Sequence, residues 1–137
     1  MSVPDAAASL CQSLAQVLQQ RGWMMATAES CTGGLIAAAC TDLSGSSVWF
    51  ERGFVTYSNL AKQQMLGVPE SLLIAHGAVS EPVAVAMAQG AVQHSAAQVA
   101  LSVTGIAGPS GGTADKPVGT VWFGWQVAGR TFGEHHL

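Results

Sequence analysis

The chain has 137 residues, of which 49% are apolar and only 9% are charged, and its formal net charge is −3. That length favours a single domain over residues 1–137, and the five scattered basic residues form no stripe able to follow a phosphate backbone, which argues against a nucleic-acid partner. No apolar run approaches the ~20 residues that span a bilayer, and the amino terminus lacks the charged start of a signal peptide, so we expect a cytoplasmic protein with no membrane partner.

Helices and strands alternate through most of the chain. Leucines at helical spacing before Gly22 predict the first helix, and alanine-rich segments predict further helices packed closely on a sheet. Runs of β-branched and aromatic residues predict the strands, with Gly53 as a candidate bulge. In chain order, the predicted elements are a helix over 5–21, a strand over 23–28, a helix over 33–41, a strand over 48–57, short helices over 59–66 and 70–75, a long buried helix over 80–94, and strands over 98–104, 119–127 and from 130 onwards.

This alternation predicts an α/β fold, with a three-layer α/β/α arrangement, a mixed, mostly parallel sheet and an antiparallel hairpin at one edge. Loops at the carboxyl ends of strands are where such sheets usually place their sites. Two loops have a suitable composition, namely the segment around Ser30 and the glycine-rich segment after Thr104.

Residues 26–34 read Ala-Thr-Ala-Glu-Ser-Cys-Thr-Gly-Gly, an apolar run that breaks into small polar residues before a predicted helix. The pattern favours a strand-to-helix elbow that carries Ser30 beside unpaired backbone N–H groups at the helix start, where an oxyanion is stabilised. The same pattern is typical of a helix cap without any chemistry, and the segment alone leaves both interpretations open.

A serine nucleophile needs a base, and the histidines lie in no recognisable site loop. Ser58 and Asn59 are both candidate caps of the next helix. If Ser58 is the cap, Lys62 falls in the first turn, where the helix dipole and partial burial both lower the pKa of a lysine. The alternative, an ordinary solvated lysine, is equally compatible with the sequence. Tyr57 precedes this turn and is a candidate proton relay, or else a half-buried packing residue.

The three cysteines, Cys11, Cys31 and Cys40, have no C-x-x-C spacing, which supports neither a disulfide framework nor a zinc site. Cys31 remains an alternative nucleophile, because a thiol at a helix start can ionise readily. It ranks below Ser30, since no histidine partner is evident.

Four separated segments, in the same order, resemble the C-terminal domain family of the competence/damage-inducible protein CinA, and the resemblance covers residues from about 5 to 133. The segments are residues 28–34, 56–59 with Lys62, 77–80 and 102–109. The family includes stand-alone nicotinamide mononucleotide amidohydrolases. The resemblance therefore implies a small pyridine-nucleotide substrate, whose carboxamide is hydrolysed to nicotinic acid mononucleotide and ammonia.

The resemblance also implies catalytic roles for Ser30, Tyr57 and Lys62. A neutral Lys62 would deprotonate Ser30, which attacks the amide carbon, and water would then cleave the acyl-enzyme; no metal or other cofactor is required. Candidate substrate-binding residues are Thr32, Gly33, Gly34, Ser58, Asn59, Thr104, Gly105 and Gly108.

Three other interpretations stay open: a non-catalytic nucleotide-binding or regulatory domain, an amidase for another small amide, and an oligomeric scaffold. The scarcity of charge favours a homodimer or higher homo-oligomer, in which another copy covers apolar surface. Family members usually continue past the last strand with a basic segment and a closing helix, whereas this sequence is short at its C-terminus and ends at Leu137. That difference leaves substrate affinity and assembly open.

Overall fold

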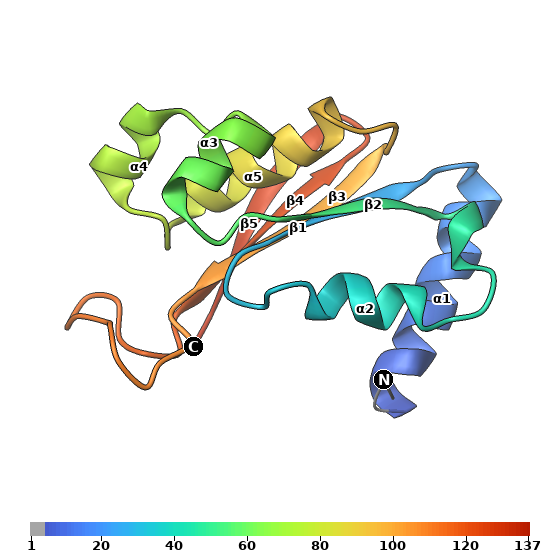
Figure 1. The fold of residues 1–137 in the computed structure, drawn as a ribbon. Helices are drawn as coiled ribbons and strands as arrows, with labels where there is room; N and C mark the ends of the chain where they lie inside the picture. Colours follow the sequence, from blue (N-terminus) through green and yellow to red (C-terminus); the bar gives the residue numbers. More distant parts are fainter. Residues whose placement is uncertain (1–4) are drawn as a thin grey trace.

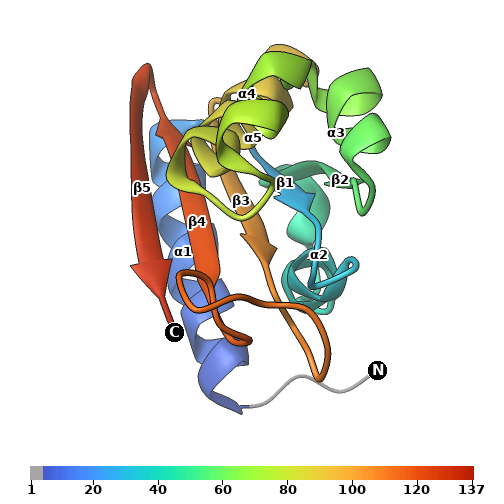
Figure 2. The same cartoon turned by 90° about the vertical axis from the view of Figure 1, so that its left-hand side faces the viewer.

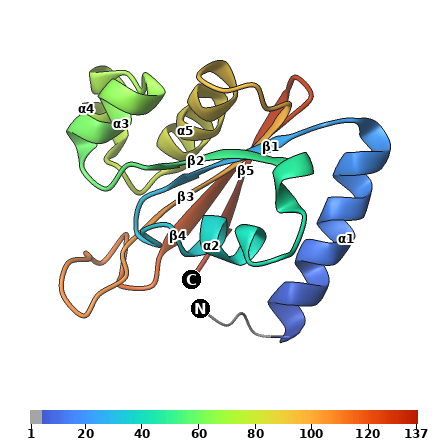
Figure 3. The same ribbon diagram turned by 45° about the vertical axis from the view of Figure 1, so that its right-hand side comes forward.

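The computed structural model describes residues 5–137 and arranges them in three layers, with a five-stranded sheet between two groups of helices (Figure 1). The strands are β1 (Met25–Glu29), β2 (Phe50–Val55), β3 (Val99–Gly105), β4 (Val121–Val127) and β5 (Arg130–His136). One face carries α1 (Asp5–Arg21) and α2 (Leu35–Thr41), whereas the other carries α3 (Asn59–Leu66), α4 (Glu70–His76) and α5 (Glu81–Gln93) (Figure 3). A short 3₁₀ turn, η1 (Ser46–Val48), precedes β2.

The sheet has the strand order β2-β1-β3-β4-β5. β1 is parallel to both β2 and β3, whereas β4 is antiparallel to both β3 and β5. The predicted α/β fold, with a mixed sheet and an antiparallel edge hairpin, is confirmed. Because β1 and β3 are parallel, they end at the same edge of the sheet, where the turn after β1 and the long loop after β3 lie together (Figure 2).

The prediction of a bulge at Gly53 is wrong. The pairing of β1 with β2 shifts by one residue at Glu51, between the partners of Met25 and Ala26. Gly53 itself pairs in regular register with Thr27, and a Cβ atom at Gly53 would lie 2.9 Å from the Thr27 hydroxyl oxygen. The glycine therefore permits a close approach of side chains from the neighbouring strand.

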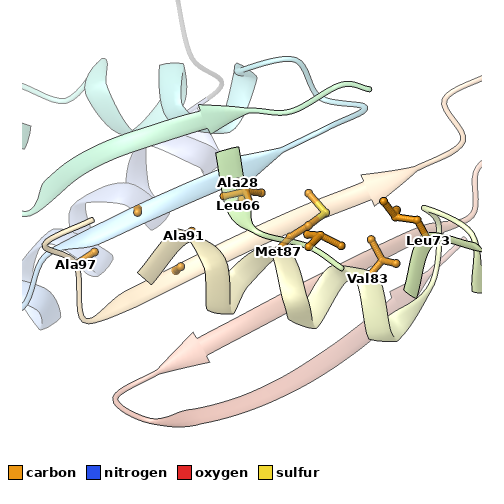
Figure 4. Packing of buried hydrophobic residues seen from close by; sticks show 10 residues of the cluster. Ala28, Leu66, Leu73, Val83, Met87, Ala91 and Ala97 are labelled. Carbon is orange, nitrogen blue, oxygen red and sulfur yellow. The ribbon is translucent and has the colours of Figure 1, made fainter. Parts of the chain in front are cut away.

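The sheet buries residues on both faces, which is why all five residues of β1 are buried. On the α5 face, the cluster shown in Figure 4 comprises Ala26, Ala28, Leu66, Val68, Leu73, Val83, Met87, Ala91, Ala97 and Ala100. On the other face, α1 and α2 pack with the sheet through Cys11, Ala15, Leu18, Met25, Cys40, Trp49 and Val99. Among residues 5–137, no helix combines the length and apolar character that crossing a membrane requires.

The helix α5 lies unusually close to its neighbours. A Cβ atom at Gly90 would overlap the carbonyl oxygen of Leu66 at the end of α3, and one at Gly124 in β4 would overlap the carbonyl oxygen of Ala84. Ala84 also accepts a hydrogen bond of 2.5 Å from the Ser102 hydroxyl of β3. Small residues therefore fix the distance between α5, the sheet and α3, the helix that carries Lys62.

Candidate active site

Ser30 follows β1 directly, in the turn that leads to α2. Its backbone N–H donates to the carbonyl oxygen of Val103 in β3 at 3.0 Å, and only 7% of the residue is exposed. Gly33 and Gly34 then adopt positive φ angles of 61° and 109°, which favour glycine and turn the chain into α2. The predicted elbow is therefore present, with Ser30 at the carboxyl edge of the sheet.

Lys62 approaches Ser30 from α3, on the opposite side of the same sheet edge. Ser58 caps α3, because its hydroxyl oxygen accepts from the Ala61 N–H at 3.0 Å. Lys62 is 1% exposed, so the alternative of a solvated lysine does not hold. Its Nζ lies 3.0 Å from Ser30 Oγ and donates at 3.0 Å to each of the carbonyl oxygens of Thr56 and Tyr57.

Burial lowers the pKa of the Lys62 amine below its ordinary value of 10.5, with a smaller opposing effect from Cys31. A neutral amine has two N–H donors and one lone pair. The carbonyl groups of Thr56 and Tyr57 provide acceptors for the two donors, which leaves the lone pair for the hydroxyl proton of Ser30. The geometry suits a general base that activates a serine.

Tyr57 contributes to this arrangement mainly through its backbone. Its carbonyl oxygen accepts from Lys62 and also lies 3.4 Å from Ser30 Oγ. The side chain lines the mouth of the site and is 76% exposed, so the alternative of a half-buried packing residue does not hold. Within residues 5–137, no group forms a hydrogen bond with its hydroxyl.

A cavity of about 390 Å³ opens above Ser30 and Lys62. It gathers four segments: the elbow, the start of α3, the residues before α5, and the long loop after β3. Thr104 joins two of these segments, because its hydroxyl donates to the carbonyl oxygen of Ala78 at 3.0 Å. The predicted site residues that line the cavity are Ser30, Tyr57, Asn59, Lys62, Thr104, Gly105 and Gly108.

Four predicted substrate-binding residues do not line this cavity, and the structure gives each a local contact or conformation. Gly33 and Gly34 shape the elbow, and the Ser58 hydroxyl oxygen caps α3. The Thr32 hydroxyl donates to Glu29 at 2.5 Å. Sequence reasoning assigned no individual role to seven further cavity residues, although it pointed to the glycine-rich loop that contains the last five of them: Ala78, Val79, Ile106, Ala107, Ser110, Gly111 and Gly112.

Sequence reasoning also missed Glu29. This residue ends β1 with 1% of its surface exposed, and its carboxylate accepts hydrogen bonds from the N–H groups of Gly34, Ile36 and Ala37. The backbone donors that the sequence predicted to be unpaired at the start of α2 are therefore occupied. The sequence held one signal for this role: a charged residue at the end of a predicted buried strand, in a chain with only 9% charged residues.

Cys31 also lines the cavity. Burial raises the pKa of its thiol above 9.0, opposed by smaller effects of nearby backbone N–H groups and Lys62. An uncharged thiol is a poorer nucleophile than a thiolate, which agrees with the ranking of Cys31 below Ser30. In the part of the chain that the structure describes, no group of three or more His, Cys, Asp or Glu side chains is placed to hold a metal ion.

Comparison with known proteins extends the likeness seen in the sequence. The CinA C-terminal domain family matches residues 7–136. The nicotinamide-nucleotide amidohydrolase PncC of Escherichia coli strain K12 is 59% identical over 119 residues, which are 87% of this chain and 72% of that protein. The protein of the same name from Enterobacter agglomerans is 63% identical over 108 residues, which are 79% of this chain and 66% of that protein.

Solved structures show the same fold over nearly the whole chain. The competence/damage inducible protein CihA from Agrobacterium tumefaciens superposes with a TM-score of 0.94 at 47% identity, covering 98% of this chain and 83% of that chain. A CinA superfamily protein from Escherichia coli superposes with a TM-score of 0.92 at 36% identity, covering 99% of this chain and 80% of that chain.

Proposed function

Because the chain belongs to the CinA C-terminal domain family, we propose that it hydrolyses the carboxamide of nicotinamide mononucleotide to nicotinic acid mononucleotide and ammonia. The observation that carries the proposal is the distance of 3.0 Å between Ser30 Oγ and the buried Lys62 Nζ, at the floor of an open cavity. The identity of 59–63% to two proteins named as amidohydrolases of this substrate class supports the choice of substrate.

The first half of the reaction acylates Ser30. The neutral amine of Lys62 takes the hydroxyl proton while Oγ attacks the carboxamide carbon, which forms a tetrahedral intermediate with a negatively charged oxygen. Collapse of this intermediate breaks the C–N bond, and the leaving nitrogen receives the proton from Lys62 and departs as ammonia.

The second half releases the product. Lys62, neutral again, takes a proton from a water molecule that attacks the ester carbon of the acylated Ser30. The ester bond breaks, and Ser30 Oγ regains a proton from Lys62. The nicotinic acid mononucleotide releases its remaining carboxyl proton to water and leaves as a carboxylate. Both halves use the same base, because Lys62 lies within hydrogen-bond distance of Ser30 Oγ.

We assign the exposed Tyr57 side chain to the lining of the cavity, where its hydroxyl would relay the proton that passes from Lys62 to the departing nitrogen. Asn59, Thr104, Gly105 and Gly108 are proposed to contact the substrate, since all four line the cavity. We propose that Gly33, Gly34 and the side-chain hydroxyl groups of Thr32 and Ser58 act indirectly, by holding the elbow and α3 in place.

The test is an assay of ammonia release from nicotinamide mononucleotide by the parent protein, Ser30→Ala and Lys62→Ala. We expect the parent to turn over and each variant to lose roughly 10³-fold or more in kcat, as happens when a nucleophile or its base is removed. Full activity of Ser30→Ala would contradict covalent catalysis by this serine. A parent that binds the nucleotide without hydrolysing it would instead support the non-catalytic binding domain.

A matched panel of amides tests the substrate. Nicotinamide, which lacks the ribose phosphate, and nicotinamide riboside, which lacks only the phosphate, are compared with the mononucleotide at equal concentration. We expect kcat/KM to be highest for the mononucleotide. A higher value for either smaller amide would support the amidase of another small amide.

We also propose that the chain forms a homodimer or a higher homo-oligomer. Several large apolar side chains are exposed on the face that carries α1 and α2, among them Leu10 at 71% and Leu35 at 62%. A second copy would remove such surface from water. Size-exclusion chromatography with light scattering tests the proposal, and a clean monomer at micromolar concentration would contradict it.

A further inference from the structure

Glu29 places a buried carboxylate directly before the nucleophile. The residue is 1% exposed, and none of the basic side chains in residues 5–137 forms an ion pair with it. A buried carboxylate is costly unless hydrogen bonds compensate for the lost water. The carboxylate accepts four, from the Thr32 hydroxyl at 2.5 Å and from the N–H groups of Gly34 at 3.3 Å, Ile36 at 3.0 Å and Ala37 at 2.9 Å.

These bonds decide which backbone donors remain near Ser30. Seven of the nine backbone N–H groups between residues 30 and 38 form hydrogen bonds. Four donate to backbone carbonyl groups, namely those of Ser30, Gly33, Leu35 and Ala38. The N–H groups of Gly34, Ile36 and Ala37 donate to the Glu29 carboxylate. Within the part of the chain that the structure describes, the N–H groups of Cys31 and Thr32 alone in this stretch donate to no oxygen atom, and the only acceptor near them is the Cys31 sulfur. Both immediately follow Ser30, and Cys31 lines the cavity.

The surroundings of Cys31 show what these two donors favour. Burial raises the pKa of the Cys31 thiol, whereas the N–H groups of Cys31 and Thr32 act in the opposite direction by stabilising negative charge on the sulfur. The negative charge that develops on the oxygen of a substrate carbonyl is stabilised in the same way, by N–H groups that converge on it.

We propose that Glu29 is a positioning residue for the reaction at Ser30. Its carboxylate holds the first turn of α2 and Thr32, which fixes the elbow so that the N–H groups of Cys31 and Thr32 stay directed at the reacting carbonyl oxygen. The inference rests on the proposed function, because it concerns an attack by Ser30 on a carbonyl-like centre. It adds that the backbone donors for the oxyanion come from the two residues after the nucleophile and not from the first turn of α2.

The substitution Glu29→Gln separates this role from simple filling of space. Glutamine has the same shape, but its amide nitrogen donates and cannot accept. In the variant, an amide NH₂ group takes the place of one of the two carboxylate oxygens. In one orientation of the amide, this NH₂ group faces the Ala37 N–H, which donates to Oε2 in the parent. In the other, it faces the three groups that donate to Oε1 in the parent. The elbow should then shift while the chain still folds.

The matched control is Glu51→Gln. Glu51 is also a partly buried carboxylate, and it accepts from the Arg52 guanidinium and from the N–H group of Ala96. It lies at the start of β2, far along the strand from the Thr56 end that meets the site. Its loss should affect stability without affecting the reactivity of Ser30.

The primary measurement is the rate at which a fluorophosphonate probe labels Ser30, read by mass spectrometry of the intact protein and its peptides. Ser30 Oγ attacks phosphorus, the P–F bond breaks, fluoride leaves and the hydroxyl proton passes to Lys62. The phosphoryl oxygen gains negative charge during this step, so the labelling rate reports the elbow donors without requiring the native substrate.

We expect Glu29→Gln to label at least tenfold more slowly than the parent at temperatures well below its unfolding transition, and Glu51→Gln to label at the parent rate. With nicotinamide mononucleotide, Glu29→Gln should lower kcat at least tenfold and change KM less than threefold, because the donors act in the transition state. A merely structural role would lower activity only in proportion to the folded fraction.

Labelling of Glu29→Gln within twofold of the parent overturns the inference, and so does a parent that does not react at Ser30. Failure of the parent to hydrolyse nicotinamide mononucleotide, with Ser30 still labelled, refutes the proposed substrate alone. If Glu29→Gln does not fold, Thr32→Val removes one donor to the carboxylate, and an unchanged labelling rate in that variant overturns the inference equally.

Discussion

The amine nitrogen of Lys62 lies 3.0 Å from Ser30 Oγ, although the two residues are 32 positions apart in the chain. Parallel pairing of β1 with β2 produces this contact, because both strands end at the same edge of the sheet. Ser30 follows β1 at that edge, and Lys62 enters from the helix after β2. The carbonyl oxygens of Thr56 and Tyr57 then hold the amine in place.

The buried amine should control how activity depends on pH. Burial lowers the pKa of Lys62 from 10.5, and the base must be neutral to accept a proton from Ser30. We therefore expect kcat/KM to rise with pH and to level off through an ionisation below 10.5. The pH profile of nicotinamide mononucleotide hydrolysis measures this directly. If kcat/KM rises with an apparent pKa at or above 10.5, Lys62 is not the base.

The same pKa shift couples folding to pH. Between the lowered pKa of folded Lys62 and the unfolded value of 10.5, the unfolded chain binds more protons than the folded one. The free energy of unfolding should therefore rise with pH in that window. Denaturant titrations of the parent and of Lys62→Met test the sign, and an equal slope in both proteins would exclude Lys62 as the source.

Cys31→Ala should leave the chemistry nearly intact. Burial raises the pKa of the thiol above 9.0, so the thiol stays protonated in the neutral range where a thiolate would be needed for attack. We expect kcat within about threefold of the parent, since the backbone N–H of residue 31 is retained. The assay is the ammonia release described above. A loss of kcat as large as that of Ser30→Ala would indicate that Cys31 is the nucleophile.

Ser58→Ala should act on stability more than on substrate binding. The Ser58 hydroxyl oxygen caps α3 by accepting from the Ala61 N–H, and its removal should cost about 1 kcal/mol of unfolding free energy. We expect KM to change little, because Ser58 does not line the cavity. Ser58→Thr should restore stability. A large rise in KM with unchanged stability would instead place the hydroxyl on the substrate.

Gly90→Ala should destabilise the protein, although the same change stabilises most exposed helices. Alanine gains about 1 kcal/mol over glycine in a helix interior, but here its Cβ would overlap the Leu66 carbonyl oxygen. Overpacking of this kind typically costs about 1–3 kcal/mol, so we expect a net loss. Gln89→Ala, on the exposed side of α5, is the control and should change stability by less than about 0.5 kcal/mol. Thermal or denaturant unfolding of both variants decides the sign.

The sequence predicted most of the fold because its signals were local. The predictions from the leucine spacing before Gly22, from the Ser58 cap and from the alanine-rich segment over 80–94 each depend on neighbouring residues, and the corresponding helices are present. The register of β1 on β2 depends on contacts between distant residues. The glycine at position 53 is a local signal and predicted a bulge there, but the extra residue of β2 is Glu51.

The candidate site was predictable to a similar degree. The places of Ser30 and Lys62 beside a turn and a helix start made them candidates for a nucleophile and a base, and the family resemblance singled them out, but only the fold shows that they touch. Glu29 escaped because nothing local indicates that its carboxylate reaches forward to residues 34–37. Thr32 was assigned to the substrate for the same reason, since its hydroxyl has an internal partner that the sequence does not reveal.

The place of β2 at the margin of the sheet has a consequence for how the protein loses activity on heating. β2 pairs with β1 alone, and the hydrogen bond of 2.8 Å from the Thr56 N–H to the Glu29 carbonyl oxygen closes that pairing beside the site. If β2 frays, α3 moves with it and the amine leaves the serine, while β1, β3, β4 and β5 stay joined. We expect amide hydrogens of β2 to exchange faster than those of β3, and inactivation to begin at temperatures where most of the protein is still folded.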